Sequence, residues 1–249
     1  MEINKIHLGD AYELIKQVPD KSVDLIVTDP PYEIKGLSEK PHGLSKWKPG
    51  SIKHEKEMFE MKENLVEGVD LAILDEFVRV MKKINIYLWC NKEQIYDYLT
   101  YFVKERGCNW EMLIWAKENP APFYGNHYLK DKEYCLYFWE RGVDLDTRTF
   151  QTSKTVFLTQ VNKADKGKYA HPTIKPEEII ENLIKNSCGG GLVFDPFVGS
   201  GTTCAVAKRL GYDYLGFEIN PKWHAVAVDR LNGITKKQRD AGIEQLRLF

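Results

Sequence analysis

The stretch of sequence that decides the fold is VDLIVTDPPY, residues 23–32. Its first six residues are apolar or β-branched except for Asp24, a pattern typical of a strand buried in a mostly parallel sheet. Pro30 and Pro31 end this strand, because proline has no backbone N–H for a ladder and holds φ near about −65°. The sequence therefore predicts a rigid corner at the carboxyl end of a strand, where open α/β sheets bind their ligands.

This corner carries the chemistry needed to hold a flat ring with an amino group. Asp29 supplies a carboxylate, the backbone after the strand supplies carbonyl groups outside any ladder, and Tyr32 supplies an aromatic face. Carboxylate and carbonyl oxygens accept N–H hydrogens, and a tyrosine ring stacks on another ring. Taken alone, Asp29 would be better explained as the cap of a turn.

The pattern on either side of the corner predicts a doubly wound α/β fold, because strands alternate with helices along the chain. The expected strands are 5–8, 23–28, 84–90, 110–116, 133–139, 192–195 and 214–217, with a short one at 156–159. The expected helices are 11–18, 71–83, 92–106, 176–186, 202–210 and 221–231. The strand at 133–139 is expected to run antiparallel to its neighbour, since no helix precedes it.

Composition narrows the class of protein further. The chain has 249 residues with a hydrophobic share of 43%, enough for one large domain with insertions. Its formal net charge is −1, so any nucleic-acid surface must be a local patch. The five cysteines include no CxxC pair, which argues against a zinc site or a disulfide framework. No apolar segment predicts a signal peptide or a membrane span, and we expect an intracellular protein without a metal.

A second anchor is VFDPFVGSGTT, residues 193–203, which predicts a strand, a glycine turn and the start of a helix. It lacks the lysine of a Walker A loop and the third glycine of a dinucleotide loop, so it does not form a good phosphate cradle. Glu218 ends the next strand, where an acid commonly binds ribose hydroxyls. A ligand with a ribose and an adenine but no pyrophosphate fits this pattern, and S-adenosylmethionine is such a ligand. Lys175 could bind its carboxylate, and Asp195 or a backbone carbonyl its ammonium group.

With these motifs in place, the chain resembles a beta-class DNA amino-methyltransferase. Asp29-Pro30-Pro31-Tyr32 is similar to the catalytic motif of that family, and residues 195–203 are similar to its cofactor loop. HPTIKP, residues 171–176, is similar to the segment that precedes this loop, and Asp10 matches the acid near the cofactor adenine. The order of the two motifs is that of the beta class, whose fold is a circularly permuted, Rossmann-like methyltransferase fold.

The resemblance implies a direct methyl transfer to a base flipped out of the duplex. In that reaction Asp29 and the carbonyl of Pro30 accept hydrogen bonds from the target amino group, Pro31 shapes the motif, and Tyr32 stacks on the base. The implied cofactor contacts are Asp10, Lys175, Asp195, Phe197, Gly199, Ser200, Gly201, Thr202, Glu218 and Asn220. His171 is a weaker candidate for the same site.

The resemblance also carries expectations about substrate and partners. Asp29 favours adenine N6 as the target; N4 of cytosine and a non-catalytic DNA-binding or cofactor-binding subunit are the alternatives. We expect residues 1–249 to form a single catalytic domain, with an inserted loop or lid at 33–67 and a small target-recognition region at 120–170. Expected phosphate contacts are Lys46, Lys48, Lys53, Lys154, Lys163, Lys166 and Lys168. A homodimer, a cognate restriction endonuclease and a cytoplasmic location in a bacterial or phage-infected cell complete these expectations.

Overall fold

A computed structural model of the chain describes residues 1–32, 69–120, 128–146, 149–161, 167–169 and 174–240. The predicted lid at 33–67 lies outside these residues, as do Lys46, Lys48, Lys53, Lys163, Lys166 and His171. In the part of the chain that the structure describes, no helix is long and apolar enough to cross a membrane.

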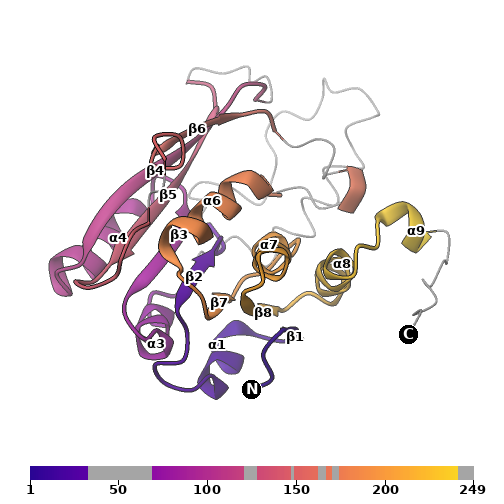
Figure 1. The fold of residues 1–249 in the computed structure, drawn as a ribbon, viewed down its shortest axis with the longest axis horizontal. Helices are drawn as coiled ribbons and strands as arrows, with labels where there is room; N and C mark the ends of the chain where they lie inside the picture. The colour runs from indigo at the N-terminus through magenta and orange to yellow at the C-terminus, as the bar shows by residue number, and fades with distance from the viewer. Residues whose placement is uncertain (33–68, 121–127, 147–148, 162–166, 170–173, 241–249) are drawn as a thin grey trace, which may run out of the picture.

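The described residues form an eight-stranded sheet with the strand order β1-β8-β7-β2-β3-β5-β4-β6 (Figure 1). The strands are β1 (Lys5–Leu8), β2 (Leu25–Thr28), β3 (Asn85–Cys90), β4 (Asn109–Lys117), β5 (Lys132–Trp139), β6 (Val156–Thr159), β7 (Leu192–Asp195) and β8 (Asp213–Glu218). The pairs β1–β8, β8–β7, β7–β2, β2–β3 and β4–β6 are parallel. Only β5 runs against its neighbours β3 and β4 among these strands, as the sequence predicted.

Helices cover both faces of the sheet, which confirms the doubly wound fold (Figure 1). One face carries α1 (Ala11–Leu14), η1 (Ile15–Gln17), α3 (Ile73–Val80), α4 (Ile95–Leu99) and the π-helical η3 (Thr100–Glu105). The other face carries α6 (Glu177–Ser187), α7 (Thr202–Leu210) and α8 (Pro221–Leu231), with α9 (Lys236–Asp240) beyond them. Two apolar cores result, one on each side of the buried strands β2 and β3.

Two helices are shorter or less regular than the periodicity predicted. The helix expected at 11–18 is one α-helical turn followed by a 3-10 turn, and it ends where Arg79 donates to the carbonyl oxygens of Ile15 and Val18, each at 2.8 Å. The helix expected at 92–106 begins at Ile95 and changes to π geometry at Thr100. In the first case a tertiary contact, rather than helix propensity, sets where the helix ends.

The strand directions bring a particular set of residues to one edge of the sheet. The carboxyl ends of β1, β8, β7, β2 and β3 lie side by side, because these strands are parallel neighbours. Since β5 runs the other way, its first residues reach this same edge, next to the last residues of β3 and β4. Glu133, near the start of β5, therefore lies beside the carboxyl ends of β3 and β4.

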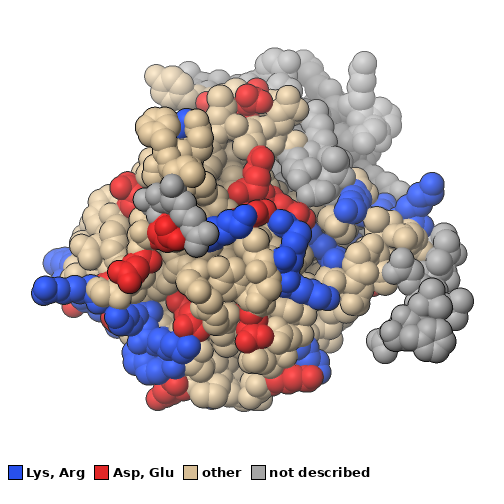
Figure 2. Space-filling view, in the orientation of Figure 1, with Lys and Arg blue, Asp and Glu red and all other residues tan. Residues whose placement is uncertain are grey.

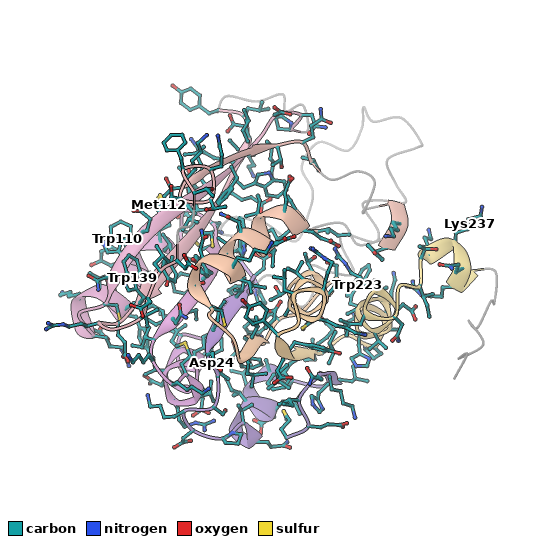
Figure 3. The ribbon with its side chains drawn as sticks, in the orientation of Figure 1. Asp24, Trp110, Met112, Trp139, Trp223 and Lys237 are labelled. Atoms are coloured by element: carbon teal, nitrogen blue, oxygen red, sulfur yellow. The ribbon has the colours of Figure 1, made fainter. Side chains whose placement is uncertain are left out.

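The side of the molecule formed by β4, β5 and β6 includes much of the predicted recognition region. Figure 2 shows Lys and Arg side chains at several places on one face, with Asp and Glu between them. Trp110, Met112 and Trp139 lie along the β4–β5 side of the sheet, and Trp223 lies on α8 (Figure 3). Lys154 Nζ lies 5.0 Å from the ring centroid of Phe150, and Lys168 Nζ lies 4.9 Å from that of Tyr169. The roles of this region and of its lysines remain predictions.

Gly216 on β8 is a point at which the fold leaves no room for a side chain. A Cβ there would lie 2.5 Å from Val198 Cγ2 and 2.8 Å from Cys204 Sγ. We expect Gly216→Ala to lower the free energy of unfolding by about 1–3 kcal/mol, because overpacking forces neighbouring groups apart. Urea unfolding followed by circular dichroism measures this change. Gly189→Ala, where nothing lies within 4 Å of the added Cβ, is the control and should change stability by less than about 0.5 kcal/mol.

Candidate active site

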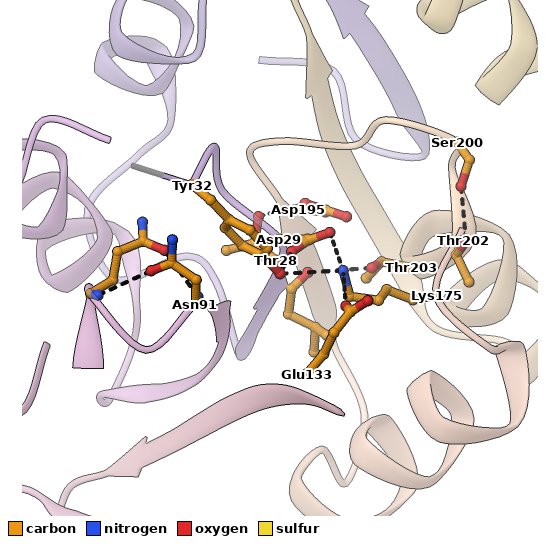
Figure 4. Close-up of polar contacts among 12 residues, drawn as sticks. Thr28, Asp29, Tyr32, Asn91, Glu133, Lys175, Asp195, Ser200, Thr202 and Thr203 are labelled. Atoms are coloured by element: carbon orange, nitrogen blue, oxygen red, sulfur yellow. Dashed lines mark hydrogen bonds and ion pairs between the residues drawn. The ribbon is translucent and has the colours of Figure 1, made fainter. Parts of the chain in front are cut away.

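Asp29 lies at the centre of a polar cluster at the end of β2 (Figure 4). Its carboxylate pairs with the ammonium group of Lys175 and accepts a hydrogen bond of 2.6 Å from the Tyr32 hydroxyl. Lys175 Nζ also lies 3.1 Å from Glu133 Oε2, and Lys117 Nζ lies 2.6 Å from Glu133 Oε1. Two carboxylates and two ammonium groups therefore alternate in one connected row.

The pKa values of this cluster show that its charges stabilise one another. Burial opposes the charge on Lys175, but Asp29 and Glu133 raise its pKa above the ordinary value for lysine. Burial likewise opposes ionisation of Glu133, yet Lys175 and Lys117 lower its pKa to about 2. The pKa of the Tyr32 hydroxyl is raised by burial and by the Asp29 carboxylate. Lys175 and Glu133 are thus ionised at neutral pH, with Tyr32 protonated beside them.

The backbone of the corner is held from the turn that follows β3. Gln94, which is buried, donates from Nε2 to the carbonyl oxygen of Pro31 at 3.1 Å. Asn91 accepts hydrogen bonds from the N–H groups of Glu93 and Gln94 at 3.0 Å and 3.2 Å, which fixes the turn after β3. The rigid corner predicted from two prolines is therefore also fixed by a side chain about sixty residues away in sequence.

Asp195 joins the second predicted motif to the first. Its Oδ1 accepts hydrogen bonds from the Thr28 hydroxyl at 2.7 Å and from the Phe197 N–H at 3.1 Å. Burial raises its pKa to about 6, although these hydrogen bonds act in the opposite direction. Because Thr28 immediately precedes Asp29, this contact brings the motif predicted to be catalytic and the motif predicted to bind the cofactor together at one edge of the sheet. The predicted convergence of the two corners is confirmed.

The glycine loop after β7 has the geometry of a close backbone cradle. Glu218 accepts hydrogen bonds from the N–H groups of Gly199 and Asn220, each at 2.8 Å. Gly201 has a φ of +80°, and a Cβ there would lie 3.0 Å from the backbone of Ala227. A ligand with ribose hydroxyls and an ammonium group fits these acceptors, because the carboxylates of Glu218 and Asp195 are buried beside the loop.

The remaining predicted cofactor residues lie near this loop. Asp10 caps α1 through its side chain, which accepts from the Tyr12 N–H at 2.9 Å. Phe197 packs edge-on against Tyr12, with ring centroids 6.5 Å apart. Asn220 caps α8 with its side chain, and the hydroxyls of Ser200 and Thr202 lie 3.1 Å apart. Cofactor binding by these residues remains a prediction.

Arg230 is a member of the site that sequence reasoning missed. Its guanidinium is buried beneath the loop, donates to Thr202 Oγ1 at 2.8 Å and to Ser200 O at 3.3 Å, and pairs with Glu177 at 2.6 Å. It thereby connects the glycine loop to the first turn of α6, directly after Lys175.

Glu133, Lys117 and Gln94 were also missed as site residues. Lys117 directly follows the strand predicted at 110–116, and Gln94 falls in the helix predicted at 92–106. Glu133 begins the strand predicted to be antiparallel. The reversed direction of that strand was the available signal for Glu133, because it places the start of the strand at the ligand-binding edge.

Comparison with known proteins agrees with this geometry. The family model described as DNA methylase, for N6 and N4 methyltransferases, matches residues 23–229. The type II methyltransferase M.HinfI of Haemophilus influenzae is 28% identical over 99% of this chain and 73% of its own length. The type II methyltransferase M2.DpnII of Streptococcus pneumoniae is 26% identical over 90% of this chain and 87% of its own.

Solved structures show the same fold. The M1.HpyAVI–SAM complex has a TM-score of 0.66 at 23% identity, covering 92% of this chain and 98% of that one. The cytosine-N4-specific PvuII DNA methyltransferase has a TM-score of 0.67 at 19% identity, covering 95% of this chain and 90% of that one.

The strand order and the likeness to these structures give the chain the Rossmann-like fold of this class of methyltransferases. Within that class, the chain belongs to the DNA methylase family of N6-adenine and N4-cytosine amino-methyltransferases. The family resemblance, the fold and the cofactor expected from the sequence are confirmed at this level, and the chain is an enzyme of the DNA-modifying type.

The Arg230 contacts generate a prediction about stability. We expect Arg230→Met to lower the free energy of unfolding by about 2–3 kcal/mol, because it leaves Glu177 and the loop hydroxyls without their buried donor. Urea unfolding measures this loss. The control is Arg209→Met, whose half-exposed guanidinium pairs with Glu177 at 3.6 Å and Glu181 at 2.8 Å, and whose loss should cost under about 1 kcal/mol. Equal losses in both variants would contradict the role given to Arg230.

Proposed function

We propose that the protein methylates N6 of adenine in a specific DNA sequence, by flipping the base and transferring the methyl group directly. The observation that supports this most strongly is the placement of Asp29 and Tyr32 within hydrogen-bonding contact of each other, beside the Asp195 loop. An aspartate at the first position of the corner favours adenine over cytosine. N4 of cytosine is the alternative target, and a cytosine-N4-specific enzyme is among the structural neighbours.

In this proposal Asp29 and the Pro30 carbonyl orient the target amino group. Each accepts one N–H hydrogen, so that the nitrogen lone pair is directed at the methyl group. Tyr32 stacks on the extruded base and compensates for part of the stacking lost from the duplex. When bound, S-adenosylmethionine supplies a methyl carbon on a sulfonium sulfur, and the sulfur retains the electron pair of the broken bond. The methylated nitrogen carries positive charge until one proton passes to Asp29 and from there to water, so the carboxylate stabilises the charge that develops.

The cofactor contacts in this proposal follow the described cradle. Glu218 binds the ribose hydroxyls and Asp195 attracts the ammonium group. Lys175, which the sequence suggested for the cofactor carboxylate, is assigned to Asp29 in this proposal, because its ammonium group pairs with Asp29 and Glu133. Asp10, Phe197 and Asn220 surround the adenine, and the backbone of the loop from Gly199 to Thr202 closes against it.

The DNA surface in this proposal includes the region 120–170 and the loop at 33–67. Of the lysines proposed to contact phosphate groups, Lys154 and Lys168 belong to the part of the chain that the structure describes. The region 120–170 is small for a complete recognition domain. Either the recognised sequence is short, or a second copy of the chain shares its reading. A restriction endonuclease of the same specificity is the partner in this proposal. Exchange of residues 120–170 with those of a relative should change the methylated sequence.

Asp29→Ala tests the proposed chemistry. We expect the variant to retain S-adenosylmethionine binding and to lose methyl transfer by at least about 100- to 1,000-fold in kcat, because an acceptor that acts mainly in the transition state is removed. Tritium transfer from labelled cofactor to duplex DNA measures kcat, and calorimetry measures binding. Digestion of the product DNA to nucleosides distinguishes N6-methyladenine from N4-methylcytosine. No transfer to any DNA by the wild type would favour the non-catalytic subunit instead.

The raised pKa of Asp195 predicts that cofactor affinity depends on pH. Below its pKa of about 6 the carboxyl gains a proton and no longer attracts an ammonium group. We therefore expect the Kd for S-adenosylmethionine to rise by up to about tenfold for each pH unit below that value, and to be constant above it. Calorimetry between pH 5 and 8 measures this profile. Asp195→Asn should remove this rise of the Kd at low pH, whereas Glu218→Gln should weaken cofactor binding and keep the rise.

A further inference from the structure

The row of charges around Asp29 raises a physical problem for the proposed reaction. Lys175 contacts the Asp29 carboxylate directly and is itself almost fully buried, so solvent screens its charge only weakly. A bare cation at this position would weaken the negative potential of Asp29 at the target nitrogen, where positive charge develops during transfer. Some other group must compensate for the charge of Lys175.

Glu133 is placed to do so. Its Oε2 lies 3.1 Å from Lys175 Nζ, and its Oε1 is fixed by Lys117 Nζ at 2.6 Å. The three groups come from different elements: Lys117 ends β4, Glu133 begins β5, and Lys175 precedes α6. Figure 4 shows Glu133 and Asp29 converging on Lys175 from separate strands.

We propose that Glu133 is a positioning residue for methyl transfer: it holds Lys175 and neutralises its charge, so that Asp29 remains an effective acceptor for the target amino group. Lys117 supports this role by fixing the second oxygen of Glu133. The inference rests on the proposed function, because it assigns Asp29 the acceptor role. The antiparallel strand β5 thereby contributes a residue to the proposed reaction as well as hydrogen bonds to the sheet.

Described groups from three parts of the sheet surround Lys175. They are Asp29 and Tyr32 after β2, Trp89 and Cys90 on β3, and Glu133 and Cys135 on β5. Burial raises the pKa of the Cys90 thiol to about 12 and that of Cys135 well above its ordinary value, so both are uncharged at neutral pH. Among the described groups that contact Lys175, the carboxylates are those of Asp29 and Glu133. Glu133 is therefore the group that balances the charge of Lys175 when Asp29 binds the target amino group.

Glu133→Gln tests the proposal, since glutamine keeps the shape and removes the charge. We expect kcat for DNA methylation to fall by about tenfold or more, with the Kd for S-adenosylmethionine changing by less than about threefold. The matched control is Glu181→Gln on α6. Glu181 also pairs with two cations, Lys185 and Arg209, and its side chain is 26% exposed compared with 23% for Glu133. This control should leave kcat unchanged.

A second readout does not depend on activity. The ¹⁵Nζ signal of Lys175, assigned through Lys175→Arg, can be followed against pH in the full chain without cofactor. We expect it to remain constant up to about pH 10.5 in the wild type, and to begin shifting at lower pH in Glu133→Gln. Glu181→Gln should behave as the wild type does. In Glu133→Gln alone, kcat/KM should rise through the same lower pH, because loss of the Lys175 proton removes the uncompensated charge beside Asp29.

Lys117→Met gives a variant that preserves Glu133. In Lys117→Met, the Lys175 signal should begin to shift at the same pH as in the wild type or higher, which is the opposite of the effect of Glu133→Gln. General disruption of the site would instead move this pH in the same direction in both variants. The double variant should have the kcat of Glu133→Gln, because Lys117 acts through Glu133. Unchanged kcat and an unchanged Lys175 signal in folded Glu133→Gln would overturn the proposal. If instead the wild type transfers no methyl group while the Lys175 signal responds as expected, the proposed function fails and the charge balance stands.

Discussion

The Lys175 ammonium group lies between the carboxylates of Asp29 and Glu133, and the polar site depends on that arrangement. A buried ion is costly unless it is paired, so Lys175, Asp29 and Glu133 would each be unfavourable alone at this edge of the sheet. Together with Lys117 they form a neutral row that spans four separate parts of the chain. The same pairing fixes the position of Asp29, which accepts a hydrogen bond from the amino group of the base in the proposed reaction.

Strand direction explains why these groups meet. Parallel strands place their carboxyl ends at one edge, and Asp29, Asp195 and Glu218 reach it for this reason. One reversed strand contributes its beginning instead, and β5 brings Glu133 to the same edge. A fully parallel sheet would place this residue at the opposite edge. The antiparallel strand therefore has a consequence for the electrostatics of the site.

The two motifs are held by side chains that touch neither base nor cofactor in the proposed reaction. Gln94 fixes the carbonyl of Pro31, and Arg230 fixes the loop through Ser200 and Thr202. The hydrogen bond between Thr28 and Asp195 then joins the two motifs directly. Rigid support of this kind matters because a methyl transfer without a covalent enzyme intermediate depends on positioning and electrostatics.

The sequence by itself determined the order of strands and helices, the reversed strand, the two motifs and the family. These are local signals: hydrophobic period, proline and glycine positions, and residue types at strand ends. It also brought Asp29, Asp195 and Glu218 to one site, because parallel strand ends must share an edge. Only the tertiary structure decided that Lys175 contacts Asp29, and that Glu133, Lys117, Gln94 and Arg230 support the site. The physical reason is that a charged or polar side chain is placed by partners distant in sequence, and no local pattern specifies which partner it will meet.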